Sequence, residues 1–333
     1  MKSTAKALSL GKLLLHTAEK RPWVAFSRRA DDILVGPEYD AAELERRAES
    51  HTKLWLASGL GEGDRVGIVA VPEPEIVAAI VGAVRAGLEV VLFPTSLGAP
   101  EIAATAGLAK ALALAGPAEF AGLDLAKRLS EARAAAAMTW LMLWERERPR
   151  LFRLDNGQPT ESAPAPEEGE AGLAMISGSR LMALDGPSLS AVAGDLADAM
   201  ELQAGSTILS LVSPATAAGL VAGTHTPLIA GAKLVWLTPF SAKQLDAALT
   251  DYARAHLVAP GAVAAQLGRA GLLSQGRLAS LTLIVAEGDP TPYFDTDLDA
   301  DRVFLLDSGL TGPTPLSRLS GEPMSYAEDE DLS

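Results

Sequence analysis

The first clear pattern of hydrophobic and polar positions covers residues 40–58. Apolar residues recur there every three or four positions, and charged residues fill most of the positions between them. This spacing predicts an amphipathic helix, with Asp40 as its N-cap and Gly59 as its C-terminal stop.

A strand, a helix and a second strand are predicted next. Residues 66–71 form a short apolar run that is closed by Pro72. Residues 75–86 have helical spacing, and residues 90–93 form another apolar run, ended by proline. The length of this unit fits a parallel strand–helix–strand crossover.

The same alternation continues along the rest of the chain. Residues 101–137 are rich in alanine and predict helical structure around a short strand at 111–115. Further strands are expected at 171–177, 207–212, 233–237, 256–258, 281–285 and 303–306. Further helices are expected at 188–202, 217–230, 241–255 and 261–273. The predicted fold class is therefore α/β, a layered core of two similar subdomains with mostly parallel sheets.

A polar segment divides the chain. Residues 155–170 hold three prolines, two glycines and five acidic residues, which indicates an exposed linker. The expected organisation is a first α/β subdomain at 1–160, a linker at 161–170, a second subdomain at 171–316 and an acidic disordered tail at 317–333.

Charge and composition exclude several classes of function. The chain of 333 residues has 28 basic and 42 acidic side chains, so its net charge is −14, and no basic patch offsets this. Such a chain repels a phosphate backbone, and no nucleic-acid partner is expected. It has no cysteine, which excludes disulfides, thiolate nucleophiles and cysteine-bound metals.

No membrane span is expected. The longest stretch without formal charge is 202–232, but it contains two prolines, four glycines and several polar residues. A strand, loop and helix buried in a globular core explain it better. The apolar run near the N-terminus, residues 13–15, is too short for a signal peptide, and a cytoplasmic location is expected.

Motifs for common chemistries are missing. The glycines of 59–64 follow a helix and precede a strand, the reverse of a dinucleotide fingerprint, so they indicate a helix stop and turn. The acidic run 295–301 lacks the glycine and glutamate of a calcium loop and is expected to be a solvated loop. No two of the four histidines have metal-pair spacing, and His225 is expected to be buried and hydrogen-bonded.

One loop indicates anion binding. A predicted strand ends in Ser177, Gly178, Ser179 and Arg180. Small hydroxylated residues and a glycine at the end of a strand can offer backbone N–H groups and hydroxyls to a phosphate. An ordinary turn is the alternative.

The order of several segments resembles that of a known family. The segments Tyr39–Leu44, Gly59–Val66 and Ala79–Gly87 occur in the same order as in the N-terminal part of the adenylate-forming enzymes. These are the acyl-CoA synthetases, luciferases and peptide-synthetase adenylation domains. In this family the first segment opens a helix, the second is a turn, and the third leads to a strand that ends in proline, here Pro94.

The resemblance continues in the second half. Met175–Ser179 resembles the start of the family's phosphate loop, and Leu306–Gly312 lies where the family has its Tyr-Gly-x-Thr-Glu motif. The resemblance implies that ATP or AMP would be held by Ser177, Gly178, Ser179, Arg180, Ser308, Gly309 and Thr311. It implies an acyl pocket at Thr216, Gly219, Leu220 and Pro260.

The departures from the family concern catalysis. The family's phosphate loop continues with threonine, two glycines and a lysine, whereas this chain has Arg180–Asp185 with Leu184 near the lysine position. Leucine cannot neutralise a triphosphate. Gly312 stands where the family has a magnesium-binding glutamate. Nothing matches the family's ribose-binding aspartate, hinge or C-terminal lid domain with its catalytic lysine. No catalytic residue and no metal ligand is assigned.

The resemblance and these departures together predict a non-catalytic homologue. It would keep an acyl- or nucleotide-shaped cleft and bind a carboxylic acid, or serve as a partner for an enzyme or acyl carrier protein that covers the face of the missing lid. One alternative is an active ligase that uses the predicted phosphate-loop residues while a separate chain supplies the lid and lysine. Another is an assembly protein with no ligand.

Overall fold

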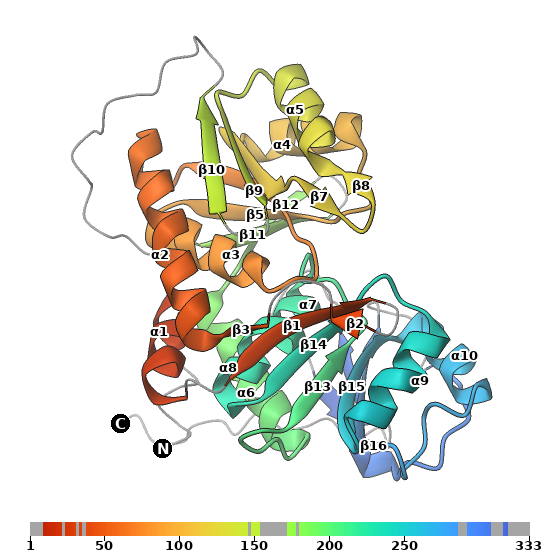
Figure 1. The fold of residues 1–333 in the computed structure, drawn as a ribbon. Helices are drawn as coiled ribbons and strands as arrows, with labels where there is room; N and C mark the ends of the chain where they lie inside the picture. The colour runs from red at the N-terminus through yellow and green to blue at the C-terminus, as the bar shows by residue number, and fades with distance from the viewer. Residues whose placement is uncertain are drawn as a thin grey trace.

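The computed structural model describes most of the chain: residues 9–21, 24–30, 33–34, 38–145, 148–153, 172–177, 180–285, 292–307 and 316–318. Two large sheets dominate the fold, one in the upper and one in the lower part of Figure 1. The predicted mostly parallel α/β fold is confirmed.

The first sheet has seven strands, and its inner strands are parallel. Only its two edge strands pair in antiparallel fashion. In spatial order the strands are β10 (Arg148–Arg153), β9 (Trp140–Glu145), β6 (Ala113–Pro117), β4 (Arg65–Val69), β5 (Glu89–Phe93), β11 (Leu173–Ser177) and β12 (Arg180–Leu184).

The second sheet has nine strands. They are β18 (Leu316–Arg318), β17 (Val303–Asp307), β16 (Leu278–Val285), β15 (Ala255–Pro260), β13 (Thr207–Ser210), β14 (Lys233–Leu237), β1 (Ala25–Ala30) and β2 (Ile33–Leu34), with β3 (Tyr39–Asp40) also paired to β1. The six strands from β17 to β1 are parallel.

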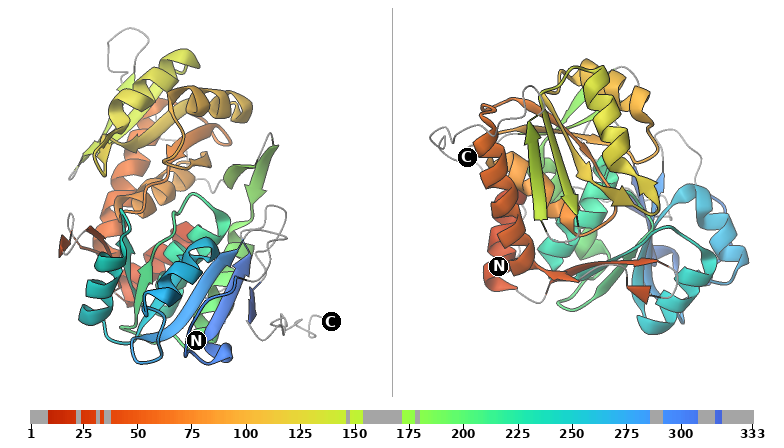
Figure 2. Two further views of the ribbon diagram at one scale, coloured as in Figure 1. Left: turned by 90° about the vertical axis from the view of Figure 1, so that its right-hand side faces the viewer. Right: turned by 45° about the horizontal axis from the view of Figure 1, so that its top comes forward.

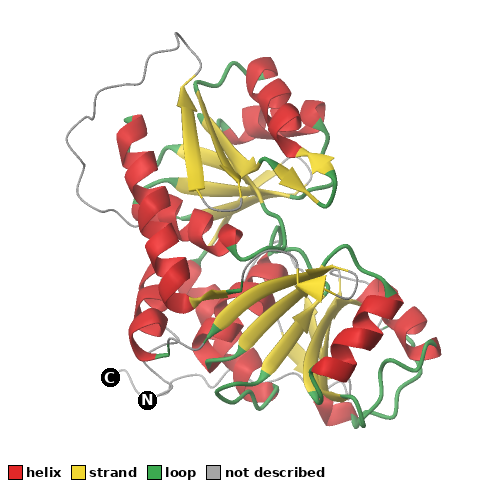
Figure 3. Ribbon diagram, in the orientation of Figure 1, coloured by secondary structure: helices red, strands yellow, loops and turns green. Residues whose placement is uncertain are grey.

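Helices complete five layers, seen as red ribbons around the yellow sheets in Figure 3. The outer face of the first sheet carries α4 (Ala99–Ala109) and α5 (Leu125–Ala135). The outer face of the second carries α9 (Ala242–Asp251) and α10 (Ala264–Arg269). Between the sheets lie α1 (Leu10–Lys20), α2 (Ala41–Ser58), α3 (Glu75–Arg85), α6 (Gly186–Ala199), α7 (Ala217–Leu220) and α8 (Thr226–Ala230). Figure 2 shows the same layers from two further sides.

The predicted crossover and its preceding helix are confirmed. The side chain of Asp40 accepts a hydrogen bond from the Glu43 backbone N–H at 2.7 Å, and Gly59 ends α2 with a left-handed φ of 77°. The strands β4 and β5 pair in parallel on either side of α3 in the chain. Gly82 of α3 lets α2 approach closely, because a Cβ there would lie 2.4 Å from the Cβ of His51.

The helix predicted at 217–230 is present but widened in its middle. Residues Val221–His225 form a π-helical turn, η2, between α7 and α8. Pro227 explains the widening, because it has no N–H to donate and its ring would collide with the Gly223 carbonyl in a regular helix.

Sheet membership crosses the boundary expected near 161–170. β1 comes from the first half of the chain but pairs with β14 in the second sheet, whereas β11 and β12 come from the second half but extend the first sheet. The order of the segments in the sequence does not determine which strand of which sheet a segment pairs with. The predicted linker at 155–170 lies outside the described residues, and the start of the predicted tail, Ser317 and Arg318, forms part of β18.

Among the described helices, none is long and apolar enough to cross a membrane. The uncharged stretch at 202–232 forms a strand, a loop and the α7–α8 segment in the core, as expected. No group of three or more potential metal ligands occurs within the described part of the chain.

Candidate functional site

The carboxyl ends of the central strands of the two sheets meet. Ser213 follows β13 of the second sheet, and its Oγ donates a hydrogen bond of 3.3 Å to the carbonyl of Ala70, which follows β4 of the first sheet. Ligands of open α/β sheets bind outside the carboxyl ends of the strands. This edge is therefore the candidate functional site.

The predicted acyl-pocket residues lie along this edge. Thr216 caps α7, since its Oγ1 accepts a hydrogen bond of 3.0 Å from the Gly219 backbone N–H. A Cβ on Gly219 would lie 1.9 Å from the carbonyl oxygen of Ser213, so only glycine fits. Leu220 is fully buried, and Pro260 ends β15, the strand next to β13. Thr216, Gly219 and Leu220 thus lie in the helical segment that follows β13, and Pro260 ends the neighbouring strand, with Gly219 and Leu220 in packing roles.

Two residues of the predicted phosphate loop, Ser177 and Arg180, belong to the antiparallel pair β11 and β12. Ser177 ends β11 and pairs directly with Arg180, the first residue of β12. Gly178 and Ser179, which connect them, lie outside the described residues, as do Ser308, Gly309 and Thr311. Because β11 lies beside β5 in parallel, the pair of Ser177 and Arg180 is at the carboxyl edge of the first sheet.

The residues after Arg180 form a strand where the family's phosphate loop would continue. Leu181 pairs with Ile176 and Leu184 pairs with Leu173. Leu181 packs on the core beneath α4 and α5, and Leu184 packs on the core between the sheets. Hydrophobic contacts on both faces therefore hold β12 in the sheet.

A carboxyl group missed by the sequence reasoning lies at the same edge. Glu73 follows β4, and its Oε1 accepts a hydrogen bond of 2.9 Å from the indole N–H of Trp144 at the end of β9. Burial raises the pKa of Glu73 to about 7. Its position between two prolines directly after a predicted strand was the available signal, hidden among many acidic residues.

An arginine from the second sheet lies near this carboxyl group. Arg28 of β1 is 9% exposed, and its Nε donates a hydrogen bond of 3.1 Å to the Thr238 carbonyl after β14. Its guanidinium carbon lies 4.5 Å from the ring centre of Phe120, which follows β6. Burial lowers the pKa of Arg28, and the charge of Glu73 opposes this shift.

A buried polar network fixes the helix that carries this turn. Glu75, at the start of α3, contacts Nε2 of His51 and Nη1 of Arg47, both at 2.9 Å. The guanidinium of Arg47 also lies 4.2 Å from the ring centre of Tyr39, and burial raises the pKa of that phenol to about 12. These contacts join α2 to α3 and thereby position the turn before α3 that carries Glu73.

His225 is buried, as expected. Its Nδ1 donates to the Leu220 carbonyl at 3.2 Å, which leaves Nε2 as a buried acceptor with no hydrogen-bond partner in the described structure. Burial lowers the pKa of His225 to about 4, so the ring is neutral at pH 7. A neutral ring locked in the π-helical turn is a structural group.

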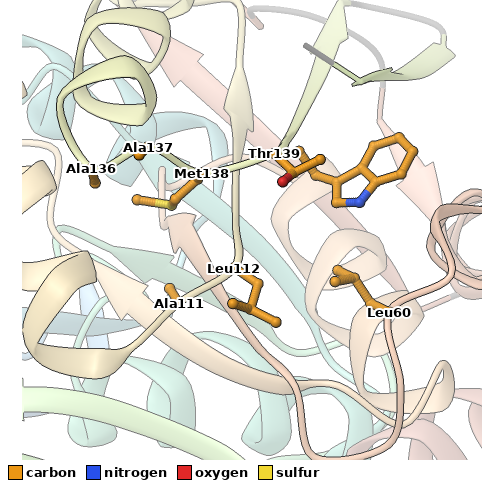
Figure 4. Close-up of a pocket in the computed structure, with 8 residues that line it drawn as sticks. Leu60, Ala111, Leu112, Ala136, Ala137, Met138 and Thr139 are labelled. Atoms are coloured by element: carbon orange, nitrogen blue, oxygen red, sulfur yellow. The ribbon is translucent and has the colours of Figure 1, made fainter. Parts of the chain in front are cut away.

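Two pockets lie away from the carboxyl edge. The one in Figure 4 has a volume of about 210 Å³ and lies where β4, β6 and β9 begin. Its lining is mostly apolar: Leu60, Ala111, Leu112, Ala136, Ala137, Met138, Thr139 and Trp140. A more open groove of about 450 Å³ runs between α2 and Pro149 of β10. Neither is at the strand ends where this fold class binds ligands.

Among the comparisons with known proteins, only the one with solved structures found similar proteins, and it shows the fold. No family model matches the sequence, and no curated protein matches it either. MatB from Rhodopseudomonas palustris superimposes with a TM-score of 0.70 and 17% identity over 95% of this chain. The N-terminal domain of FACL13 from Mycobacterium tuberculosis gives a TM-score of 0.67 at 17% identity over 90% of this chain and 76% of its own.

A structure from studies of fatty acyl-adenylate ligases of E. coli and L. pneumophila gives a TM-score of 0.64 at 15% identity, over 90% of this chain and 57% of its own. The chain spans 62% of the length of MatB. The fold is therefore that of the N-terminal core of adenylate-forming ligases, as the order of sequence segments predicted.

Proposed function

We propose that this chain is a non-catalytic binding protein built on the adenylate-forming fold. It binds a carboxylic acid or a nucleotide monophosphate at the carboxyl edge near Ser213 and does not form acyl-adenylates. Its matches include an ATP-bound structure of MatB with a TM-score of 0.69. Of such a site, this chain keeps the part that binds the acid or the monophosphate.

The observation that carries the proposal is strand β12. A loop that holds a triphosphate offers unpaired backbone N–H groups, glycines that permit close approach, and a cation. Here the backbone from Arg180 to Leu184 pairs with β11, and leucines lie at 181 and 184. The strand is stronger support for a loss of phosphate contacts than the replacement of any single residue of the family's phosphate loop.

The remaining polar groups support binding of a smaller ligand. Thr216 and Ser213 lie at the start of α7, and Arg180 begins β12 at the edge of the first sheet. One arginine can hold a carboxylate or a single phosphate through charge-assisted hydrogen bonds. It does not replace the cation, magnesium and glycine contacts of a triphosphate.

Binding of AMP, MgATP and a series of carboxylic acids, measured by calorimetry on the purified chain, tests the proposal. We expect an acid or AMP to bind at least as tightly as MgATP. Arg180→Gln should weaken that binding about tenfold or more. Arg150→Gln, on the opposite edge strand β10, is the matched control and should leave it unchanged.

Two results would contradict the proposal. Tight MgATP binding that Arg180→Gln abolishes would favour an active ligase completed by a separate chain. Absence of binding by every compound would favour an assembly protein.

A further inference from the structure

Arg28 is a buried cation whose terminal nitrogens have no hydrogen-bond partner in the described residues. Its Nε donates a hydrogen bond to the Thr238 carbonyl, and Phe120 covers one face of the guanidinium. The described ion pairs include none with Arg28, although the residue is only 9% exposed. A buried guanidinium normally has its donors satisfied by carboxylates or carbonyls.

The nearest carboxyl group does not fill this role. Glu73 interacts electrostatically with Arg28 but makes no direct ion pair with it, and Trp144 holds its Oε1. The other charged group that acts on Glu73 is Glu75, which is itself paired with Arg47 and His51. Arg28 and Glu73 thus interact electrostatically at the same edge, where one presents N–H donors and the other a carboxyl group that can hold a proton.

These groups come from the carboxyl ends of several strands. Arg28 lies in β1 and Thr238 follows the neighbouring strand β14, while Glu73, Phe120 and Trp144 follow or end β4, β6 and β9. Strands β6, β9, β14 and β1 lie on the opposite side of the β4–β13 contact from β11 and β15, and Glu73 follows β4 itself. The group is therefore separate from Arg180 and Pro260.

We propose that Arg28 and Glu73 form a second binding site, for a small monocarboxylate, with Phe120 as its apolar wall. The guanidinium donates through both Nη groups to the carboxylate oxygens, and Glu73, when protonated, donates its O–H to one of them. When Glu73 is ionised it repels the ligand and competes for the charge of Arg28. A phosphate dianion is disfavoured, because it would face the Glu73 carboxylate with twice the charge.

Titration of the full chain with benzoate, followed by NMR, tests this site, and benzamide serves as the uncharged analogue of the same shape. We expect saturable benzoate binding that weakens as the pH rises from about 6 to about 8. Benzamide should bind at least about tenfold more weakly. Acetate should occupy the same site with lower affinity, because it contacts less of Phe120.

Variants locate the site. Arg28→Gln should weaken benzoate binding at least about tenfold, and Arg28→Lys should bind with intermediate affinity. Glu73→Gln should keep binding and remove its pH dependence. Arg46→Gln, at an exposed arginine of α2, should change nothing.

Several outcomes would overturn the proposal. One is that benzoate and acetate show no saturable binding up to ~10 mM. Another is that benzamide binds as tightly as benzoate, or that Arg28→Lys and Arg28→Gln bind benzoate as tightly as the wild type. An unchanged pH dependence in Glu73→Gln would remove that residue from the site. Loss of AMP binding at the hairpin edge would leave these results unaffected, because the two sites share no residue.

Discussion

Ser177 and Arg180 face each other as paired residues of an antiparallel hairpin. The pairing of β11 with β12 therefore extends to the point where a longer phosphate loop was considered from the sequence. This pairing determines how much of the backbone is free to meet a ligand. It is the basis of the proposed loss of triphosphate binding.

Backbone hydrogen exchange should confirm the hairpin in solution. The amides of β12 that are bonded to β11 should exchange at least about tenfold more slowly than those of residues 293–297, which lack regular structure. The comparison is made within one sample, so it does not depend on the global stability. Exchange of those bonded β12 amides at the rate of 293–297 would mean that this segment is an open loop.

A methyl group at Gly219 should destabilise the fold at the carboxyl edge. Gly219→Ala places a Cβ 1.9 Å from the Ser213 carbonyl oxygen, and we expect the free energy of unfolding to fall by about 2 kcal/mol or more. Gly107→Ala in α4 is the matched control, because nothing lies within 4 Å of its Cβ. That variant should be neutral or slightly more stable in the same urea titration.

The hydroxyl of Thr216 should contribute a helix cap. Thr216→Ala removes the acceptor for the Gly219 N–H and should lower the free energy of unfolding by about 1 kcal/mol. Thr216→Ser retains the oxygen and should lose much less. Equal loss in the two variants would show that the methyl group of Thr216, and not its hydroxyl, matters.

Glu73 should make stability fall with increasing pH. Its pKa is raised from 4.5 to about 7 in the folded state. The folded chain therefore binds the proton more tightly than the unfolded chain, and this advantage is complete below about pH 4.5 and lost as the pH rises through 7. At pH 8 Glu73→Gln should be more stable than the wild type by about 1 to 3 kcal/mol.

Urea unfolding of both proteins at several pH values measures this difference. The gain from Glu73→Gln should shrink towards pH 5. A gain that is the same at both ends of this range would assign the effect to packing and not to the carboxyl proton.

The sequence predicted those elements in which the pattern of apolar and polar residues agrees with the burial of their side chains in the fold. Residues 40–58 form an amphipathic helix because one side is buried, and residues 233–237 form a strand because most of its side chains are buried in the core. The strand at 25–30 gave no such signal, because Arg28 and Arg29 interrupt the apolar pattern although both are buried in the fold.

The candidate site was predicted only in part, for a related reason. Thr216 and Pro260 could be placed because they lie within ordered segments of the family resemblance. Arg28 and Glu73 are 45 residues apart on different sheets, and only the three-dimensional fold brings them together. β12 was missed because Arg180–Leu184 was compared with a loop, while its pairing with β11 depends on the register of the hairpin.

The most direct test of the proposed function is an ATP–pyrophosphate exchange assay with the purified chain and a panel of carboxylic acids. A complete adenylate-forming ligase run in parallel shows that the assay conditions support exchange. With β12 in place of a phosphate loop, we predict no acid-dependent exchange above the protein-free blank. Clear acid-dependent exchange by this chain would contradict the account.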